Sequence, residues 1–266
     1  MNNEYIISLL KEDKRIGERK LDEYRDIKIT YDVSKNAEGS ARCKIGDTEV
    51  IAGVKMDIGT PYPDSKDEGV IIVTAELSPI ASPLFELGPP GSWATELARV
   101  IDRGIRESRA IDFKKLCIKE GEKVWIIFLD IYPINDSGNL IDASVLAALA
   151  ALKSARMPKL EDDKVIYGEL TDEKLKLNKL PVTITFGKID EKIFVDPDSK
   201  EEDALDSRLS ISVYDGNIHA MQKGGNEGIT IEEVEKMIDI AIKKEKELRG
   251  VLKWTQMFLQ SMKKQG

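Results

Sequence analysis

Histidine and cysteine are nearly missing from this chain. His219 is the single histidine among 266 residues, and the two cysteines, Cys43 and Cys117, lie far apart in the sequence. A zinc site needs several such ligands at close spacing, so we expect no metal site and no other cofactor. Two distant cysteines also indicate a reducing compartment without a disulfide framework, which favours the cytoplasm.

A nucleophilic relay of the Ser/His/Asp or Cys/His type would have to run through His219. This histidine lies in residues 210–221, where apolar and polar side chains alternate as in a strand. We therefore interpret His219 as an ordinary strand-face residue, with a catalytic base as the alternative.

Long apolar runs are also missing. The longest, Ala143–Leu152, falls well short of the roughly 18 residues that a spanning helix needs. The N-terminal run Tyr5–Leu10 is short and is followed at once by charged residues, so we expect neither a membrane span nor a signal peptide. Ala143–Leu152 predicts a helix that is buried on all sides.

Basic residues are fewer than acidic residues in this chain. The 40 Lys and Arg residues against 48 Asp and Glu residues give a net charge of −8, which argues against a nucleic-acid coat protein but permits a local basic groove. The length divided by about 150 predicts roughly two compact units.

The apolar pattern predicts runs of strands followed by helices. Strands are expected at residues 27–33, 39–45, 49–55, 70–77, 124–132, 182–189 and 193–196, and in a hairpin over 209–221. Helices are expected at 3–12, 92–111 and 143–155, and after a capping box at Thr230 and Glu233. The strand at 70–77 should be buried, and the connection over 158–181 is polar. Since regular strand–helix alternation is missing, an α+β fold is favoured over a doubly wound one.

The predicted helix after residue 92 carries three arginines on one face. Arg99, Arg103 and Arg106 are spaced i, i+4 and i+7, opposite an apolar face. Like charges at this spacing repel each other, and an anionic partner such as a phosphate backbone would relieve the repulsion. From the spacing alone, the alternative is a solvated face whose arginines pair with neighbouring acids.

Two further segments have a less specific pattern. Acidic residues crowd over residues 196–206, which favours a solvated loop over a divalent-cation site because no EF-hand spacing is present. The stretch Gly224–Gly228 favours a flexible connector over a phosphate cradle, because the Lys-Ser/Thr of a P-loop is missing.

Several segments together, in order over about residues 15–250, resemble the RNase PH superfamily of phosphate-dependent 3′-to-5′ exoribonucleases. Residues 15–25 resemble its opening R-x-D-G-R-x-x-x-E-x-R motif, with Gly17-Glu18 in place of Asp-Gly. Residues 39–52 resemble its G-S-A…G-x-T-x-V hairpin, and residues 136–143 resemble its D-G-N-x-x-D-A turn. Residues 96–108 and 215–225 are most similar to the non-catalytic ring subunit of the archaeal exosome.

The resemblance implies a fold of two halves, each like domain 2 of ribosomal protein S5, here assigned to residues 1–185 and 186–266. It also implies a hexameric ring of three heterodimers with a catalytic RNase PH-like paralogue, around a channel for single-stranded RNA. Cap subunits with S1/KH-type or zinc-ribbon-type RNA-binding domains would sit on one face.

Departures from the family pattern predict a catalytically silent chain. Active relatives have an Arg-Arg-Ser run before the helix glutamate, where this chain has Ser92-Trp93-Ala94. The two aspartates that act in active relatives align with Glu202 and Arg208, and a guanidinium cannot serve as a ligand or an acid near neutral pH. If the alignment slips, Asp203 and Asp206 would take those places, and the chain would itself be a phosphorolytic exoribonuclease.

By the same resemblance, Arg99 and Arg103, helped by Arg106, hold RNA near the active site of the neighbouring subunit. Their role would be to position RNA without breaking bonds. The predicted function is therefore a non-catalytic, RNA-positioning component of an exosome-type ring.

Overall fold

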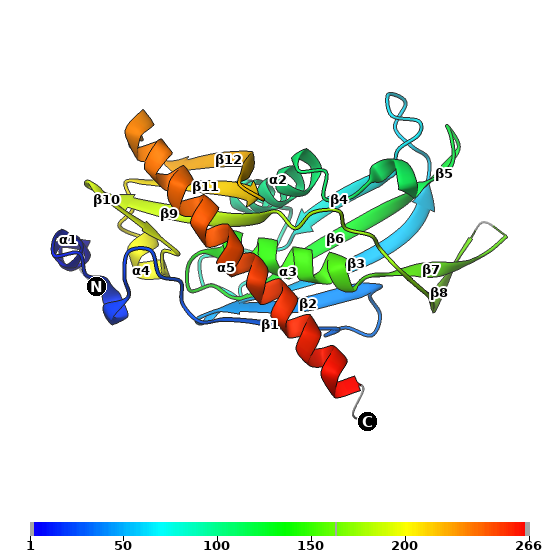
Figure 1. Cartoon of the computed structure of the whole chain (residues 1–266), viewed down its shortest axis with the longest axis horizontal. Coiled ribbons are helices and arrows are strands. Elements are labelled where there is room, and N and C mark those ends of the chain that lie inside the picture. Colours follow the sequence, from blue (N-terminus) through cyan, green and yellow to red (C-terminus); the bar gives the residue numbers. More distant parts are fainter. Residues whose placement is uncertain (1–2, 163, 264–266) are drawn as a thin grey trace.

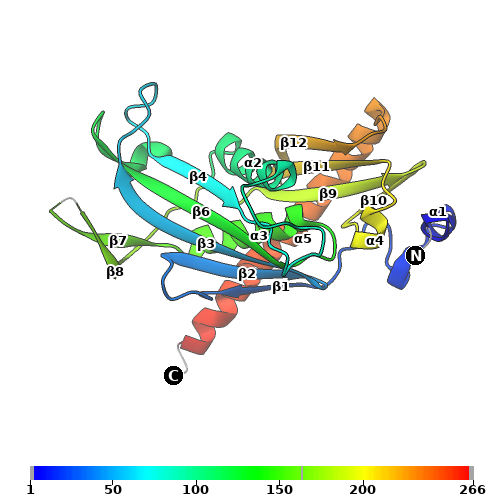
Figure 2. The same ribbon diagram turned by 180° about the vertical axis from the view of Figure 1, so that it is seen from behind.

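A computed structural model of the chain describes residues 3–162 and 164–263, with side chains described over 4–162 and 164–252. Two β-sheets lie on opposite sides of helix α3 (Leu140–Ser154), as Figure 1 shows. Figure 2 gives the same arrangement from behind. Mixed sheets and helices without regular alternation make this an α+β fold, as predicted.

The first sheet has six strands. They are β1 (Ile27–Tyr31), β2 (Gly39–Ile45), β3 (Thr48–Gly59), β4 (Val70–Ala75), β5 (Cys117–Lys119) and β6 (Lys123–Asn135). Their order is β1-β2-β3-β6-β4, with β5 also paired to β6, and β4 runs parallel to β6. Alternate residues of β3 are buried, so one face of the sheet packs on the core.

Strand β4 corrects one prediction. It lies at the edge of the sheet, and Ile72 and Thr74 are exposed while Val70 and Ile71 are buried. The expectation of a fully buried strand is wrong, because β-branched residues suit a half-exposed edge strand as well as a central one.

Helix α3 is buried along almost its whole length, as predicted. Every residue from Leu140 to Leu152 is buried, because the helix packs on β2 and β3 and also on the second sheet. The helix begins at Leu140, earlier than expected, because the side chain of Asn139 caps it by accepting a hydrogen bond from the Asp142 N–H.

The second sheet is antiparallel, with the order β10-β9-β11-β12. Its strands are β9 (Val182–Ile189), β10 (Lys192–Val195), β11 (Ser207–Tyr214) and β12 (Asn217–Gly225). The predicted domain division between residues 185 and 186 falls inside β9 and stays a prediction. Residues 1, 2, 163 and 264–266 of those domains lie outside the described part. Gly224 and Gly225 are the end of β12, so the predicted connector begins later, at Asn226.

Helix α5 (Ile231–Lys263) packs on β9, β11 and β1 and runs across α3 in Figure 1. Its capping box is confirmed: the Glu233 carboxylate accepts from the Thr230 N–H at 2.8 Å, and the Thr230 hydroxyl accepts from the Glu233 N–H at 3.2 Å. No helix in the described residues is both long and apolar enough to cross a membrane.

The remaining elements lie around these sheets. They are α1 (Asn3–Lys11), η1 (Ile16–Glu18), α2 (Ser92–Glu107), η2 (Phe113–Leu116), α4 (Ser199–Glu202), β7 (Arg156–Glu161) and β8 (Lys164–Lys174). Strands β7 and β8 form a two-stranded ribbon that projects from the body in Figure 2. The sequence predicts only a polar connection there and misses the ribbon, because most of its side chains are exposed and few apolar residues alternate along it.

Candidate functional site

Helix α2 presents two arginines that have no partner among the described residues. Its apolar face, including Leu97, Ile101 and Ile105, is buried as the sequence predicts, which turns the opposite face outward. Arg99 is exposed and Arg103 is half-buried. Neither makes a hydrogen bond or an ion pair with another residue of the described part of the chain. Their guanidinium groups are therefore available to an external anion.

Arg106, on the same face, is held by its own subunit. Its Nη2 lies 2.8 Å from Asp102 Oδ1 and donates to the Ile71 carbonyl at 3.3 Å. Its guanidinium also lies over the Phe113 ring, 5.7 Å from the centroid. The structure thus ties Arg106 to β4 and η2 and separates it from Arg99 and Arg103.

A hollow of about 950 Å³ lies before the first turn of α2, next to Ser92 and Trp93. We call it the acidic hollow, because Glu76, Glu86 and Asp136 line it and, in the described structure, no Lys, Arg or His does. Burial raises the pKa of Asp136 above its usual value. A site with this lining repels an anion such as phosphate.

Arg208 is paired inside the subunit, close to that hollow. Its Nη2 lies 2.6 Å from Glu96 Oε1, and its guanidinium lies over the Trp93 ring, 4.9 Å from the centroid. Gln222 donates to the same Glu96 oxygen at 3.2 Å. Gly224 gives the guanidinium room, because a Cβ there would lie 2.9 Å from Arg208 Nη2. Sequence reasoning missed Glu96, whose spacing on α2 gives no hint of a partner on β11.

The acidic segment over residues 196–206 is not a solvated loop, so that prediction is wrong. Asp196 and Glu201 are buried, and Asp198 caps the short helix α4 through a capping box with Glu201. The reason is that arginines from residues 15–25, distant in sequence, neutralise this segment. Of its remaining acids, Asp203 is exposed, and Asp206 Oδ2 accepts from the Asp190 N–H at 2.6 Å.

Glu202 accepts a hydrogen bond from the Asn139 N–H at 2.9 Å, at the start of α3. Burial raises the pKa of Glu202 to about 7, and the charge of Asp136 adds to this, while the Asn139 N–H opposes it. The Glu202 carboxyl group therefore holds a proton for part of the time near neutral pH. Within the described residues, no cation lines the neighbouring acidic hollow.

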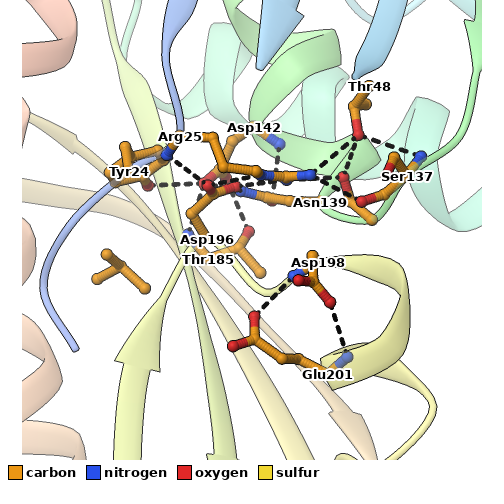
Figure 3. A network of polar contacts seen from close by, with 12 residues as sticks. Tyr24, Arg25, Thr48, Ser137, Asn139, Asp142, Thr185, Asp196, Asp198 and Glu201 are labelled. Atoms are coloured by element: carbon orange, nitrogen blue, oxygen red, sulfur yellow. Dashed lines mark hydrogen bonds and ion pairs between the residues drawn. The ribbon is translucent and has the colours of Figure 1, made fainter. Parts of the chain in front are cut away.

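A closed network of polar contacts surrounds Asp196; Figure 3 shows part of it. Arg25 Nη2 lies 2.7 Å from Asp196 Oδ1, Arg19 Nη1 lies 2.9 Å from Oδ2, and Asn139 Nδ2 donates to Oδ1 at 2.8 Å. Burial alone would raise the pKa of Asp196, but the hydrogen bonds and charge of Arg25 outweigh it and lower the pKa. Arg15 forms a second buried pair, with its Nη2 2.6 Å from Glu201 Oε2.

Asp142 extends this network into the core. It accepts from Tyr24 Oη at 2.7 Å and from Thr185 Oγ1 at 2.7 Å. Burial raises its pKa to about 6, against the hydrogen bonds that stabilise its charge. These carboxylates have partners from the chain itself, so we interpret the cluster as structural. Within the described residues, no group of three or more His, Cys, Asp or Glu side chains could hold a metal ion.

His219 lies on β12, as predicted for a strand-face residue, and its Nε2 is buried with no hydrogen-bond partner in the described part of the chain. Both cysteines are free, Cys43 buried in the core and Cys117 half-buried.

Two protein-family models match two successive parts of this sequence. The model for domain 1 of the RNase PH type, described as the 3′ exoribonuclease family, matches residues 23–158. The model for domain 2 of that family matches residues 179–244. The chain belongs to the 3′ exoribonuclease family. The predicted resemblance to the RNase PH superfamily, and with it the two-part fold, is thereby confirmed.

Individual members of this family are similar over nearly the whole chain. The exosome complex component Rrp42 of Methanosarcina acetivorans is 48% identical over 252 residues, which cover 94% of this chain and 93% of the relative. Rrp42 of Archaeoglobus fulgidus is 46% identical over 254 residues, which cover 95% and 96%.

Solved structures agree. A chain of the Archaeoglobus fulgidus exosome with RNA bound to the active site matches with a TM-score of 0.86 at 45% identity, covering 93% of this chain and 96% of that one. A chain of an archaeal exosome core matches with a TM-score of 0.82 at 42% identity, covering 94% and 96%.

Proposed function

We propose that this member of the 3′ exoribonuclease family is a non-catalytic ring subunit of an exosome-type complex in the cytoplasm. It binds RNA and helps to shape the active site of a catalytic RNase PH-like paralogue. Three such heterodimers form the hexameric ring, which carries S1/KH-type or zinc-ribbon-type caps. Relatives that are named exosome components, and the fit to exosome structures over more than nine-tenths of the chain, support this assembly.

The acidic hollow is the observation that carries the non-catalytic role. In phosphorolysis, inorganic phosphate attacks the terminal phosphodiester, so an active subunit must bind this anion and stabilise the extra negative charge of the transition state. Here the hollow beside Ser92 and Trp93 is lined by three carboxylates and, in the described residues, by no cation. Arg208, in place of an acidic group, is paired with Glu96 and has no proton to transfer near neutral pH.

The unpaired guanidinium groups of Arg99 and Arg103 support RNA binding. They lie on one face of a rigid helix and can each make two hydrogen bonds to a phosphate group. Because Arg106 is already paired with Asp102, we assign it a supporting role: it fixes α2 against β4.

Reconstitution of the ring tests the RNA role. The double variant R99A/R103A, assembled with the catalytic paralogue, should retain RNA more weakly, and the slope of log K against log salt should fall by roughly 1 to 1.5. The matched control is K243A/K246A, which removes two exposed lysines from α5. Equal RNA binding by R99A/R103A and the control would reject the role.

The isolated chain tests the non-catalytic role. Incubated with RNA and phosphate, it should release no nucleoside diphosphates, whereas the reconstituted ring should release them. The alternative function, an exoribonuclease in its own right that uses Asp203 or Asp206, predicts release by the isolated chain and its loss in D203N/D206N. Neither carboxylate lines the acidic hollow.

A further inference from the structure

The loop between β4 and α2 exposes apolar side chains. Leu84 and Leu87 are 84% and 78% exposed, more than any other large apolar side chain of the described residues, and Ile80 is 75% exposed. Leu84 and Leu87 line the acidic hollow together with the half-buried side chains of Phe85 and Trp93. Clustered apolar surface that is rimmed by polar groups is typical of an interaction site.

Hydrogen bonds hold the backbone of this loop in place. Ala81 is buried, and its carbonyl accepts from the Asp136 N–H at 2.9 Å, just after the end of β6. Two turns are closed by the Ala81 N–H, which donates to the Ser78 carbonyl at 2.9 Å, and by the Phe85 N–H, which donates to the Ser82 carbonyl at 3.1 Å. The exposure of the leucines is therefore a property of the fold.

The carboxylates of the acidic hollow have no counter-ion in their own subunit. Within the described residues, none of the three forms an ion pair. The group beside Glu76 is the phenol of Tyr132, whose pKa is raised, so this phenol is neutral at pH 7. Arg25 attracts Asp136, but Arg25 is already paired with Asp196, Nη2 to Oδ1 at 2.7 Å. The hollow therefore attracts a cation and repels RNA or an anionic membrane surface.

A subunit that shares RNA with α2 also lies beside this hollow. Trp93, in the wall of the hollow, precedes Arg99 by six residues, which corresponds to about 9 Å along the helix axis. Under the proposed function, Arg99 and Arg103 hold RNA near the active site of the neighbouring subunit. The surface of that neighbour then runs along α2 and reaches the exposed leucines.

We infer that the acidic hollow receives a segment of the catalytic RNase PH-like subunit that carries a lysine or arginine next to an apolar side chain. The cation lies among the three carboxylates, and the apolar side chain packs against Leu84 and Leu87. The volume of about 950 Å³ is at the upper end of the range for binding pockets, about 300–1,000 Å³. The inference rests on the proposed function, because its occupant is the ring partner.

Titration of the full-length chain with the purified catalytic paralogue, followed by sedimentation velocity or mass photometry, tests the apolar part of the contact. The variant L84A/L87A should assemble at least about tenfold more weakly than the parent, because two apolar side chains lose contact area. The matched control is Ile231→Ala, at another side chain that is 75% exposed, and it should assemble like the parent. Since all these side chains are exposed, thermal unfolding of the isolated variants should match that of the parent.

Glu86→Lys tests the charge part of the contact. Glu86 is exposed, so the variant should fold like the parent, but the new ammonium would repel the cation of the partner. Assembly should weaken at least about tenfold at low salt and by less at high salt, where the charges are screened. The control Glu191→Lys, at an exposed position remote from the hollow, should leave assembly unchanged.

The outcomes separate this contact from the proposed function. R99A/R103A should assemble normally while retaining RNA more weakly. Failure of the parent chain to assemble with the paralogue would reject the proposed function itself. A ring that forms equally well from L84A/L87A, or from E86K, would overturn the contact alone. A homodimer of the isolated chain that L84A/L87A abolishes would also overturn it, because a second copy would then be the occupant.

Discussion

The network around Asp196 and the outer face of α2 use arginine in opposite ways. In the network, Arg15, Arg19 and Arg25 form ion pairs with buried carboxylates, so their positive charge is compensated within the chain. On α2, Arg99 and Arg103 have no partner in the described structure. The difference teaches that the neighbours of an arginine decide its role. An arginine with a buried carboxylate partner stabilises the fold, whereas an arginine without a partner is available to a ligand.

The largest effect should come from breaking the network. Asp196→Ala leaves the Arg19 and Arg25 side chains beside a buried gap, and the free energy of unfolding should fall by about 3–5 kcal/mol. Urea unfolding at pH 7 measures this. The control Asp22→Ala, at an exposed position in the same segment, should change stability by less than about 0.5 kcal/mol. A similar small loss in both variants would refute a structural role for the network.

The pH dependence of stability should separate Glu202 from Asp196. The pKa of Glu202 in the folded chain is about 7, above its ordinary value of 4.5, so the folded state binds this proton more tightly than the unfolded state does. The resulting stabilisation is complete below about pH 4.5 and is lost as the pH rises through about 7. Asp196 behaves in the opposite way, because its pKa is lowered from the ordinary value of 3.8. Its contribution to stability is present above pH 3.8 and is lost as the pH falls below that value.

Glu202→Gln tests this difference, because the amide keeps the oxygen that accepts from the Asn139 N–H. The variant should be about 1–3 kcal/mol more stable than the parent at pH 8 and nearly equal to it at pH 4.5. Unfolding curves at several pH values check this against Glu191→Gln, an exposed control. Parallel pH profiles for the parent and Glu202→Gln would contradict it.

The Arg208 contacts should contribute less. Arg208→Ala loses a half-buried ion pair with Glu96 and the stacking on Trp93, which together stabilise the chain by about 1–2 kcal/mol. A double-mutant cycle with Glu96→Ala measures the coupling, and additive effects of the two substitutions would show that the pair is energetically idle.

Substitution of the arginines on α2 should have the smallest effect on stability. Arg106→Ala removes an i,i+4 pair with Asp102 and should cost about 0.5 kcal/mol, while Arg99→Ala should leave the unfolding free energy unchanged. RNA retention by the reconstituted ring should show the reverse order, with the larger loss for Arg99→Ala. Equal behaviour of the two variants in both measurements would remove the distinction between paired and unpaired arginines.

Local patterns allowed much of the fold to be predicted. The apolar period of α2, the all-apolar run of α3 and the Thr230 capping box depend on residues within a few positions of each other, and the structure confirms all three. Family motifs added the two-part fold, which residue spacing alone does not give.

Long-range pairs could not be predicted in the same way. Asp196 is 171 residues from Arg25, so its sequence neighbourhood shows only a run of acids, which is typical of a solvated loop. Glu96 and Arg208 are similarly remote, 112 residues apart. The candidate site residues Arg99 and Arg103 could be found from helical spacing, but only the structure separates them from Arg106.

The Arg15–Glu201 ion pair can form only late in the synthesis of the chain. The two residues are 186 positions apart, so at a synthesis rate of about 5–20 residues per second Arg15 precedes its partner by roughly 10–40 s. During that time Arg15 lacks its carboxylate partner, whereas Tyr24 and Arg25 can already contact Asp142 and the Ser137 carbonyl. The start of the segment over residues 15–25 can therefore reach its final contacts only after α4 has been synthesised, more than two-thirds of the way along the chain.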